Sequence, residues 1–192
     1  MQNLTKYLFL HILLFTICFA AWGQQPPYKR GTPQYLLEKR GFKIFKLGDP
    51  IDKYEEYVLL LDDDDKYNDI KTYQVLTYRH PRFATIGDSI EINDIILSEY
   101  NGLIISIDVF VDGEYKKPFL RSLQADYGSG HKPNPYTENY NWFASNDKDD
   151  IELIYRDNYD GQEDHLNGNG WALFQDVNLT KEAEEQKDIN DF

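Results

Sequence analysis

The sequence of 192 residues contains only one cysteine, Cys18, and only one methionine. A single thiol cannot close a disulfide within the chain, and it cannot build a cysteine-ligated zinc site. Cys18 also lies in an apolar segment near the start of the chain. We therefore expect a domain that folds without disulfides and uses no cysteine nucleophile.

Long apolar runs are equally scarce, since only residues 7–21, after Lys6, form one. This run has the length of the hydrophobic part of a secretory signal peptide and is shorter than the roughly 20 residues that span a bilayer. The small residues Ala21 and Gly23 fit peptidase cleavage before Gln24. We expect residues 1–23 to be a signal peptide and the mature chain to be periplasmic or secreted, with no transmembrane segment after cleavage.

Cys18 leaves a second interpretation open, in which cleavage just before it creates a lipid anchor. The preceding residues 15–17 (Phe-Thr-Ile) match a lipoprotein cleavage motif poorly, and a bulky Phe19 follows. A cut before Ala21, with Cys18 and Ala20 as the small residues, is a further possibility. We favour the site before Gln24 because polar residues and prolines begin there.

Basic residues are in deficit: 20 lysines and arginines face 33 aspartates and glutamates, for a formal net charge of −13. Such a field repels phosphate backbones and anionic lipid surfaces, so nucleic acid is not an expected partner. It permits cations, neutral glycans and basic protein surfaces. The aromatic content of 15% argues for a folded chain despite the charge.

The local patterns predict an α+β fold in which an antiparallel sheet carries helices packed on one side. We expect a flexible start at 24–31, a single domain at 32–180, and an acidic tail or helix at 181–192. The expected helices are 32–40, ended by Gly41, then 50–61, 118–127 and 180–187. The expected strands are 42–47, 72–78, 90–98, 103–111, 140–143, 151–155 and 171–177.

Two of these elements make sharp predictions. In the helix at 50–61, one apolar stripe would contain Ile51, Tyr54, Val58 and Leu61. The strands at 90–98 and 103–111 would form a hairpin around Asn101-Gly102, a strong turn signal. Strict alternation in the second of these strands would put Leu103, Ile105, Ile107, Val109 and Val111 on the core face.

The order of these segments resembles that of small exported proteins of Gram-negative bacteria. The similarity rests on the stretch 41–50 leading into a helix, the Asn101-Gly102 hairpin, a helix ending at 126–128, and a strand with Trp142. More loosely, the chain is similar to outer-membrane assembly lipoproteins and β-lactamase inhibitor proteins. That likeness implies a helix-on-sheet fold and binding to other proteins, and it implies no site residue.

Acidic loops are the only candidates for a metal site. Asp62–Asp65 offers oxygen ligands, but adjacent carboxylates cannot all face one ion. The segment 157–164 resembles a calcium loop around Gly161, although Arg156 and Asn167 occupy the two end positions where carboxylates belong. Both segments are more simply read as solvated loops, so we expect no cofactor.

Catalytic constellations are missing from the sequence. His80, His131 and His165 form no metal-binding pair, and Ser129 is not preceded by the strand that a nucleophile elbow requires. We therefore expect a non-enzymatic binding or envelope-associated protein, whose partner is another envelope or extracellular protein or a glycan. The candidate ligand-binding residues are the late aromatics Tyr140, Trp142, Tyr155 and Trp171.

Those aromatic residues leave two functions open. If they lie on an exposed sheet face they could stack on sugar rings, which is typical of a carbohydrate-binding module, with or without the help of a cation. Large aromatic side chains more often fill protein interiors, in which case they belong to the core.

Overall fold

Seven antiparallel strands form the main sheet of the computed structural model, which describes residues 28–62, 70–158 and 168–190. Every neighbouring pair of strands is antiparallel, which confirms the predicted α+β class. The strands at the two edges are β3 and β9. Across the sheet the order is β3 (Val58–Asp62), β4 (Ile70–Val75), β7 (Asp94–Tyr100), β8 (Leu103–Val111), β11 (Gly170–Asp176), β10 (Asp150–Arg156) and β9 (Tyr140–Ser145).

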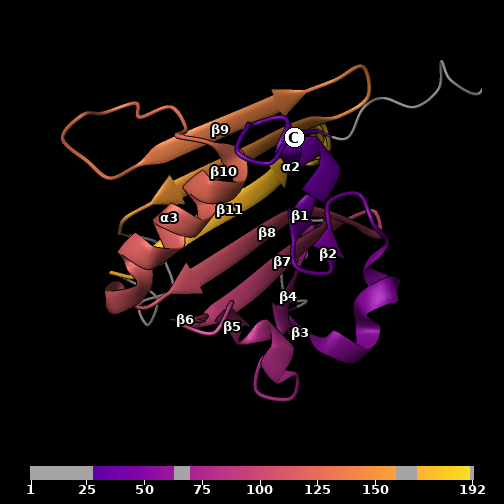
Figure 1. The fold of residues 1–192 in the computed structure, drawn as a ribbon. Helices are drawn as coiled ribbons and strands as arrows, with labels where there is room; N and C mark the ends of the chain where they lie inside the picture. Colours follow the sequence, from indigo (N-terminus) through magenta and orange to yellow (C-terminus); the bar gives the residue numbers. More distant parts are fainter. Residues whose placement is uncertain (1–27, 63–69, 159–167, 191–192) are drawn as a thin grey trace, which may run out of the picture.

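One face of this sheet is covered by α2 (Tyr35–Lys39) and α3 (Lys116–Tyr127), together with the hairpin of β1 (Gly41–Phe42) and β2 (Phe45–Lys46) (Figure 1). We call it the core face. Apolar side chains at alternate positions of the sheet are buried beneath these elements because a strand directs every second residue to the same side. They include Ile95, Leu97, Ile107, Val109, Ala172, Phe174, Ile151, Leu153 and Trp142.

The opposite face carries α4 (Val177–Asn190), which follows β11 directly. Ala183 is buried against Tyr100 and Ile105, and Leu179 packs beside them. The expected packing of helices on one side therefore holds for α2 and α3, whereas α4 packs against the other face.

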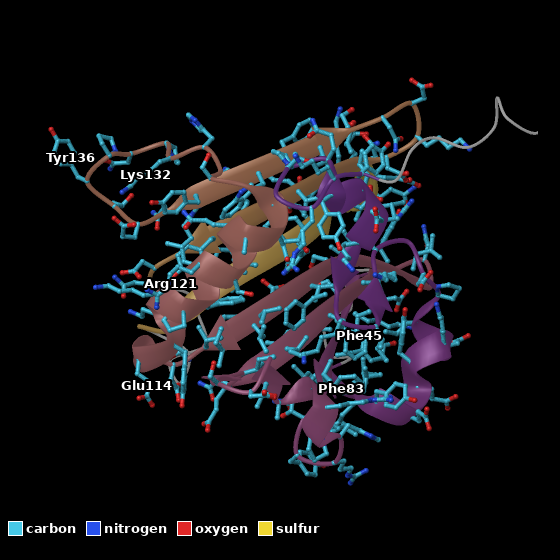
Figure 2. All side chains as sticks on the ribbon, in the orientation of Figure 1. Phe45, Phe83, Glu114, Arg121, Lys132 and Tyr136 are labelled. Carbon is cyan, nitrogen blue, oxygen red and sulfur yellow. The ribbon has the colours of Figure 1, made fainter. Side chains whose placement is uncertain are left out.

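Shorter elements complete the core below β8. The rings of Phe45 and Tyr54 have centroids 5.1 Å apart, and those of Phe45 and Phe83 have centroids 5.2 Å apart. Figure 2 labels Phe45 and Phe83 in this part of the core. These residues join β2 to two short helical turns. The short elements are η1 (Ile51–Tyr57), η2 (Pro81–Phe83), η3 (Gly113–Tyr115), β5 (Thr85–Ile86) and β6 (Ile90–Glu91).

The turn at Asn101-Gly102 is confirmed. Both residues have positive φ, 52° and 83°, and they join β7 to β8 as a tight hairpin. The positions of α3, β9, β10 and β11 also match the expected segments to within a few residues. Local signals sufficed there because each segment is bounded by residues that end an element for steric reasons, such as Gly128 after α3.

The predicted alternation along β8 is wrong in its first part. Ser98 pairs with Ser106 and Glu99 pairs with Ile104, so Ile105 is an extra residue in a β-bulge. The bulge puts Ile104 in the main core and Ile105 on the face that carries α4. One inserted residue reverses the side on which every earlier residue of the strand lies.

Two further predictions are wrong. Residues 42–47 are not one strand but the β1–β2 hairpin, which turns where Lys43 has a φ of 55°. The expected helix at 50–61 is instead η1 followed by β3. Val58 and Leu61 therefore lie in a strand and do not continue the stripe of Ile51 and Tyr54.

The expected strand at 90–98 is also divided, into β6, which pairs with β5, and β7, which belongs to the main sheet. The remaining boundaries differ by smaller amounts, since α2 begins at Tyr35 and α4 at Val177. The signal peptide, nearly all of the acidic run Asp62–Asp65, and most of the segment 157–164 lie outside the described residues.

Candidate functional site

A groove of about 490 Å³ runs beside β9, at one edge of the main sheet. Three segments that are far apart in the sequence form its walls, namely the chain before α2, the chain after α3, and β9 itself. The lining residues are Gly31, Thr32, Pro33, Gln34, Gly128, Ser129, Gly130, His131, Asn141, Trp142 and Phe143. His131 is the one titratable side chain among them.

Close backbone contacts between glycines hold two of these walls together. A Cβ on Gly128 would lie 2.9 Å from the carbonyl oxygen of Gly31, and both glycines have positive φ. The Gly31 N–H donates to the carbonyl oxygen of Asp126 over 2.7 Å, and Arg30 pairs with the Asp126 carboxylate. The start of the domain is thereby fixed to the end of α3.

Trp142 forms the base of the groove from β9. Its Nε1–H donates to the carbonyl oxygen of Gly128 over 2.9 Å. Gly130 lies against the indole ring so closely that a Cβ there would approach Trp142 Cε2 to 2.7 Å. Only glycine fits this position, because a side chain would both collide with the ring and strain a backbone whose φ is +71°.

The outer edge of β9 is paired at one residue only. The Asn141 N–H donates to the His131 carbonyl over 2.8 Å, and the His131 N–H donates to the Asn141 carbonyl over 2.7 Å. In an antiparallel strand alternate residues direct both backbone groups to the same side, so Phe143 and Ser145 also face away from β10. Within the described ranges no backbone group forms a hydrogen bond with the outward N–H and C=O groups of these two residues.

The loop between α3 and β9 is anchored near the groove by a small charged cluster. Lys132 Nζ lies 2.8 Å from Glu138 Oε1, and the Tyr140 hydroxyl donates to Glu138 Oε2 over 3.1 Å. The hydrogen bonds from Lys132 and Tyr140 hold the pKa of Glu138 below its ordinary value. Lys132 and Tyr136 lie on this projecting loop, where Tyr136 is almost fully exposed (Figure 2).

The four predicted ligand-binding aromatics do not share one exposed surface. Trp142 and Tyr155 are 1% and 0% exposed and belong to the main core, and the Tyr155 hydroxyl donates to the Lys116 carbonyl. Tyr140 is half-buried and stacks on Trp142, with ring centroids 6.0 Å apart. Trp171 lies on the opposite face of the sheet, where its Nε1–H donates to Asp108 Oδ1 over 2.7 Å.

The sequence interpretation missed Phe143, which is 54% exposed. A usable signal was present, because Phe143 stands between Asn141 and Ser145 on the polar side of an alternating strand. The glycines after α3 were read as a loop, and nothing local indicated that they would face residues 31–34.

The described segments contain no group of three or more His, Cys, Asp or Glu side chains placed to hold a metal ion. Among the helices that the structure describes, none has the length and apolar character needed to cross a bilayer.

Comparison with known proteins gives this chain no relative: no family model, curated protein or solved structure matches it.

Proposed function

We propose that this chain is an exported, non-enzymatic binding protein that takes up an extended segment of another protein at the outer edge of β9. One observation carries the proposal. The edge pairs with the chain's own His131, then presents the unpaired backbone groups of Phe143 and Ser145 beside a groove.

Strand addition suits this geometry because the main-chain bonds of the incoming segment give affinity, and pockets for alternate side chains give specificity. The bridge at Asn141, with bonds of 2.7 and 2.8 Å, supports the ability of β9 to form a further ladder on this side. The glycines at 128 and 130, both with positive φ, turn the chain away after that single pair. They leave the space opposite Phe143 open to a partner.

The groove selects the partner through one side chain. Its walls are glycine backbone, the edge of Trp142 and uncharged polar groups such as Thr32 and Gln34. An apolar side chain that faces the core side of the added strand would enter it. The exposed ring of Phe143 would cover the other side of that strand and lose contact with water, which favours binding.

Export is part of the proposal, and its support is the sequence of residues 1–23. A binding domain that works outside the cytoplasm without disulfides is consistent with a bacterial envelope or its surroundings.

Site-specific photo-crosslinking tests the function. A photoreactive p-benzoylphenylalanine in place of Phe143, in the full chain, is expected to form adducts with a partner protein. The same residue in place of Tyr136, at the exposed tip of the loop, should form none of them. Mapping of the adduct should place the link within an extended segment of the partner.

A matched pair of variants distinguishes strand addition from general adhesion. Ser145→Pro removes one outward N–H, which a strand edge tolerates. Ser145→Ala keeps that N–H and loses the same side-chain bond to Asp150. Adducts at position 143 should disappear with Ser145→Pro and persist with Ser145→Ala. Adducts that survive both changes, or that never form, would contradict the proposal.

Carbohydrate binding remains the alternative proposal, and the uncharged hydrogen-bonding side chains of the groove support it. Stacking on a sugar needs an accessible ring face. Of the four predicted aromatics only Tyr140 and Trp171 are partly exposed, so only these two could stack on a sugar. A glycan array, read with and without calcium for the wild type, Tyr140→Ala and Trp171→Ala, tests it. Hits that the substitutions leave unchanged, or no hits, would count against a glycan ligand.

A further inference from the structure

The other edge of the sheet presents a different surface. Leu59, Leu60 and Leu61 of β3 are 55%, 38% and 47% exposed, three consecutive large apolar residues open to solvent. Consecutive residues of a strand face opposite sides, so these leucines make both sides of the β3 edge apolar. An exposed apolar edge strand is also a template for pairing with another chain.

The backbone of β3 is available on its outer side. The Leu76 N–H donates to the Tyr57 carbonyl over 2.8 Å, so the backbone groups of Tyr57 face β4. By alternation, the backbone groups of Val58 and Leu60 face away from the sheet. In the parts of the chain that the structure describes, nothing pairs with them.

A second groove, of about 270 Å³, opens beside these residues. Its apolar wall is formed by Ile51, Val58, Leu60 and Tyr73, and the other lining residues are the carboxylates Asp52 and Glu55. The site therefore combines an apolar depression with two acidic groups at its border.

The two carboxylates keep their negative charge free for a ligand. Both side chains are exposed, and neither forms an ion pair among the described residues. The neighbouring cation Lys53 is paired with Asp49 over 2.6 Å, so it does not neutralise them. The chain as a whole is also strongly acidic.

We infer that the β3 edge binds a basic, amphipathic, extended segment of a partner protein. Its backbone pairs with Val58 and Leu60, one apolar side chain enters the groove, and its lysines or arginines meet Asp52 and Glu55. Charge complementarity rules out a second copy of this acidic chain as the favoured occupant. The site is separate from the β9 groove, and each can be tested with the other intact.

The probe is a synthetic peptide in which lysines stand two positions before and two positions after a central valine, with threonine between them, so that all three side chains face the groove in an extended strand. Its control replaces each lysine by glutamate. Titration into the isotope-labelled full chain, followed by amide chemical shifts, should move signals of η1, β3 and β4 with the lysine peptide only. The double variant Asp52→Lys/Glu55→Lys changes two exposed side chains and should keep the fold. Its affinity should fall roughly tenfold or more, because two attractive charge contacts become repulsive.

Two further variants locate the site. Leu59→Lys should weaken binding of the lysine peptide, whereas Phe143→Lys, a charge of the same sign on an equally exposed residue of the other edge, should leave it unchanged. The inference is overturned if no shifts occur, if the glutamate peptide binds as well, or if the signals that move lie at β9. Failure of Phe143 crosslinking would leave this result unaffected.

Discussion

The two edges of the sheet expose nearly the same amount of one apolar side chain each, 55% for Leu59 in β3 and 54% for Phe143 in β9. Their surroundings differ. β9 is flanked by glycines and by charges that are paired within the chain, such as Arg40 with Asp149 over 2.6 Å. β3 contains two further exposed leucines, and beside it lie the carboxylates Asp52 and Glu55, which form no ion pair with another described residue. Exposure alone therefore does not define an interaction site, and the neighbouring backbone and charge determine which partner fits.

The largest expected effect concerns the glycine support of the β9 groove. Gly130→Ala adds a Cβ that would lie 2.7 Å from Trp142, at a φ of +71°. Strain and collision together should lower the free energy of unfolding by about 3–4 kcal/mol. Urea unfolding followed by tryptophan fluorescence measures it.

Gly87→Ala provides the control for that measurement. Gly87 also has positive φ, at +59°, but no atom lies within 4 Å of the added Cβ. It should show the backbone strain alone, about 1 kcal/mol. Equal losses for the two variants would mean that the contact with Trp142 does not support the groove.

The centre of the sheet should respond to pH through one buried carboxyl group. Burial raises the pKa of Asp108 to about 6, against the opposing effect of the hydrogen bond from Trp171. The folded state therefore holds this proton more tightly than the unfolded state, and stability should fall as pH rises from about 4 to 6. The loss is at most about 3 kcal/mol.

Asp108→Asn keeps an oxygen that accepts the Trp171 hydrogen bond and removes the titration. Its unfolding free energy should lack this fall between pH 4 and 6 and exceed that of the wild type near neutral pH. Chemical denaturation at several pH values checks both points. A variant with an unchanged pH profile would show that another group is responsible.

Lysine at either edge should change binding with little effect on stability. Leu59→Lys and Phe143→Lys replace exposed side chains, so each should alter the unfolding free energy by less than about 0.5 kcal/mol. Leu59→Lys should weaken peptide binding at β3 only, and Phe143→Lys should weaken partner binding at β9 only. Loss of both activities in one variant, with an unchanged melting temperature, would mean that the two edges form one site.

The smallest expected effect is a difference between the two edges in how binding depends on salt. Peptide binding at β3 depends on exposed charges and should weaken as ionic strength rises to about 1 M, where the screening length is roughly 3 Å. Crosslinking from position 143 should be nearly insensitive because no lysine, arginine, aspartate or glutamate is among the residues that line the groove there. Isothermal titration at two salt concentrations measures the first, and crosslinking yield measures the second.

Much of the fold could be predicted because its hairpins depend on local chemistry. Asn101 and Gly102 accept the positive φ that a tight turn needs, and alternation marks β9, β10 and β11. The register of β8 could not be predicted, because the extra residue Ile105 is recognised only against its partner strand. The stripe from Ile51 to Leu61 led to a wrong helix for a related reason. An apolar run of that length fits a helix or a strand, and here pairing with β4 makes its second half a strand.

The candidate site was less accessible from the sequence. The alternating pattern predicted the strand that contains Trp142, but it did not show which aromatic rings of that strand would be buried by other elements. The groove depends on the contact between Gly31 and Gly128, which lie almost 100 positions apart. At β3, the error in secondary structure placed the leucines in a helix and hid the edge altogether.

The odd number of strands has a consequence for assembly. In a seven-stranded antiparallel sheet the first and last strands, β3 and β9, run in the same direction. If copies were laid side by side with the same face upward, β9 of one would meet β3 of the next in parallel, with the slanted and slightly weaker bonds of that arrangement. Antiparallel self-pairing would join like edges across a two-fold axis, and each such pairing would cover one edge of each copy and leave its other edge open. A ribbon of this chain would therefore need either parallel pairing of β9 with β3 or two different self-pairings, β3 with β3 and β9 with β9.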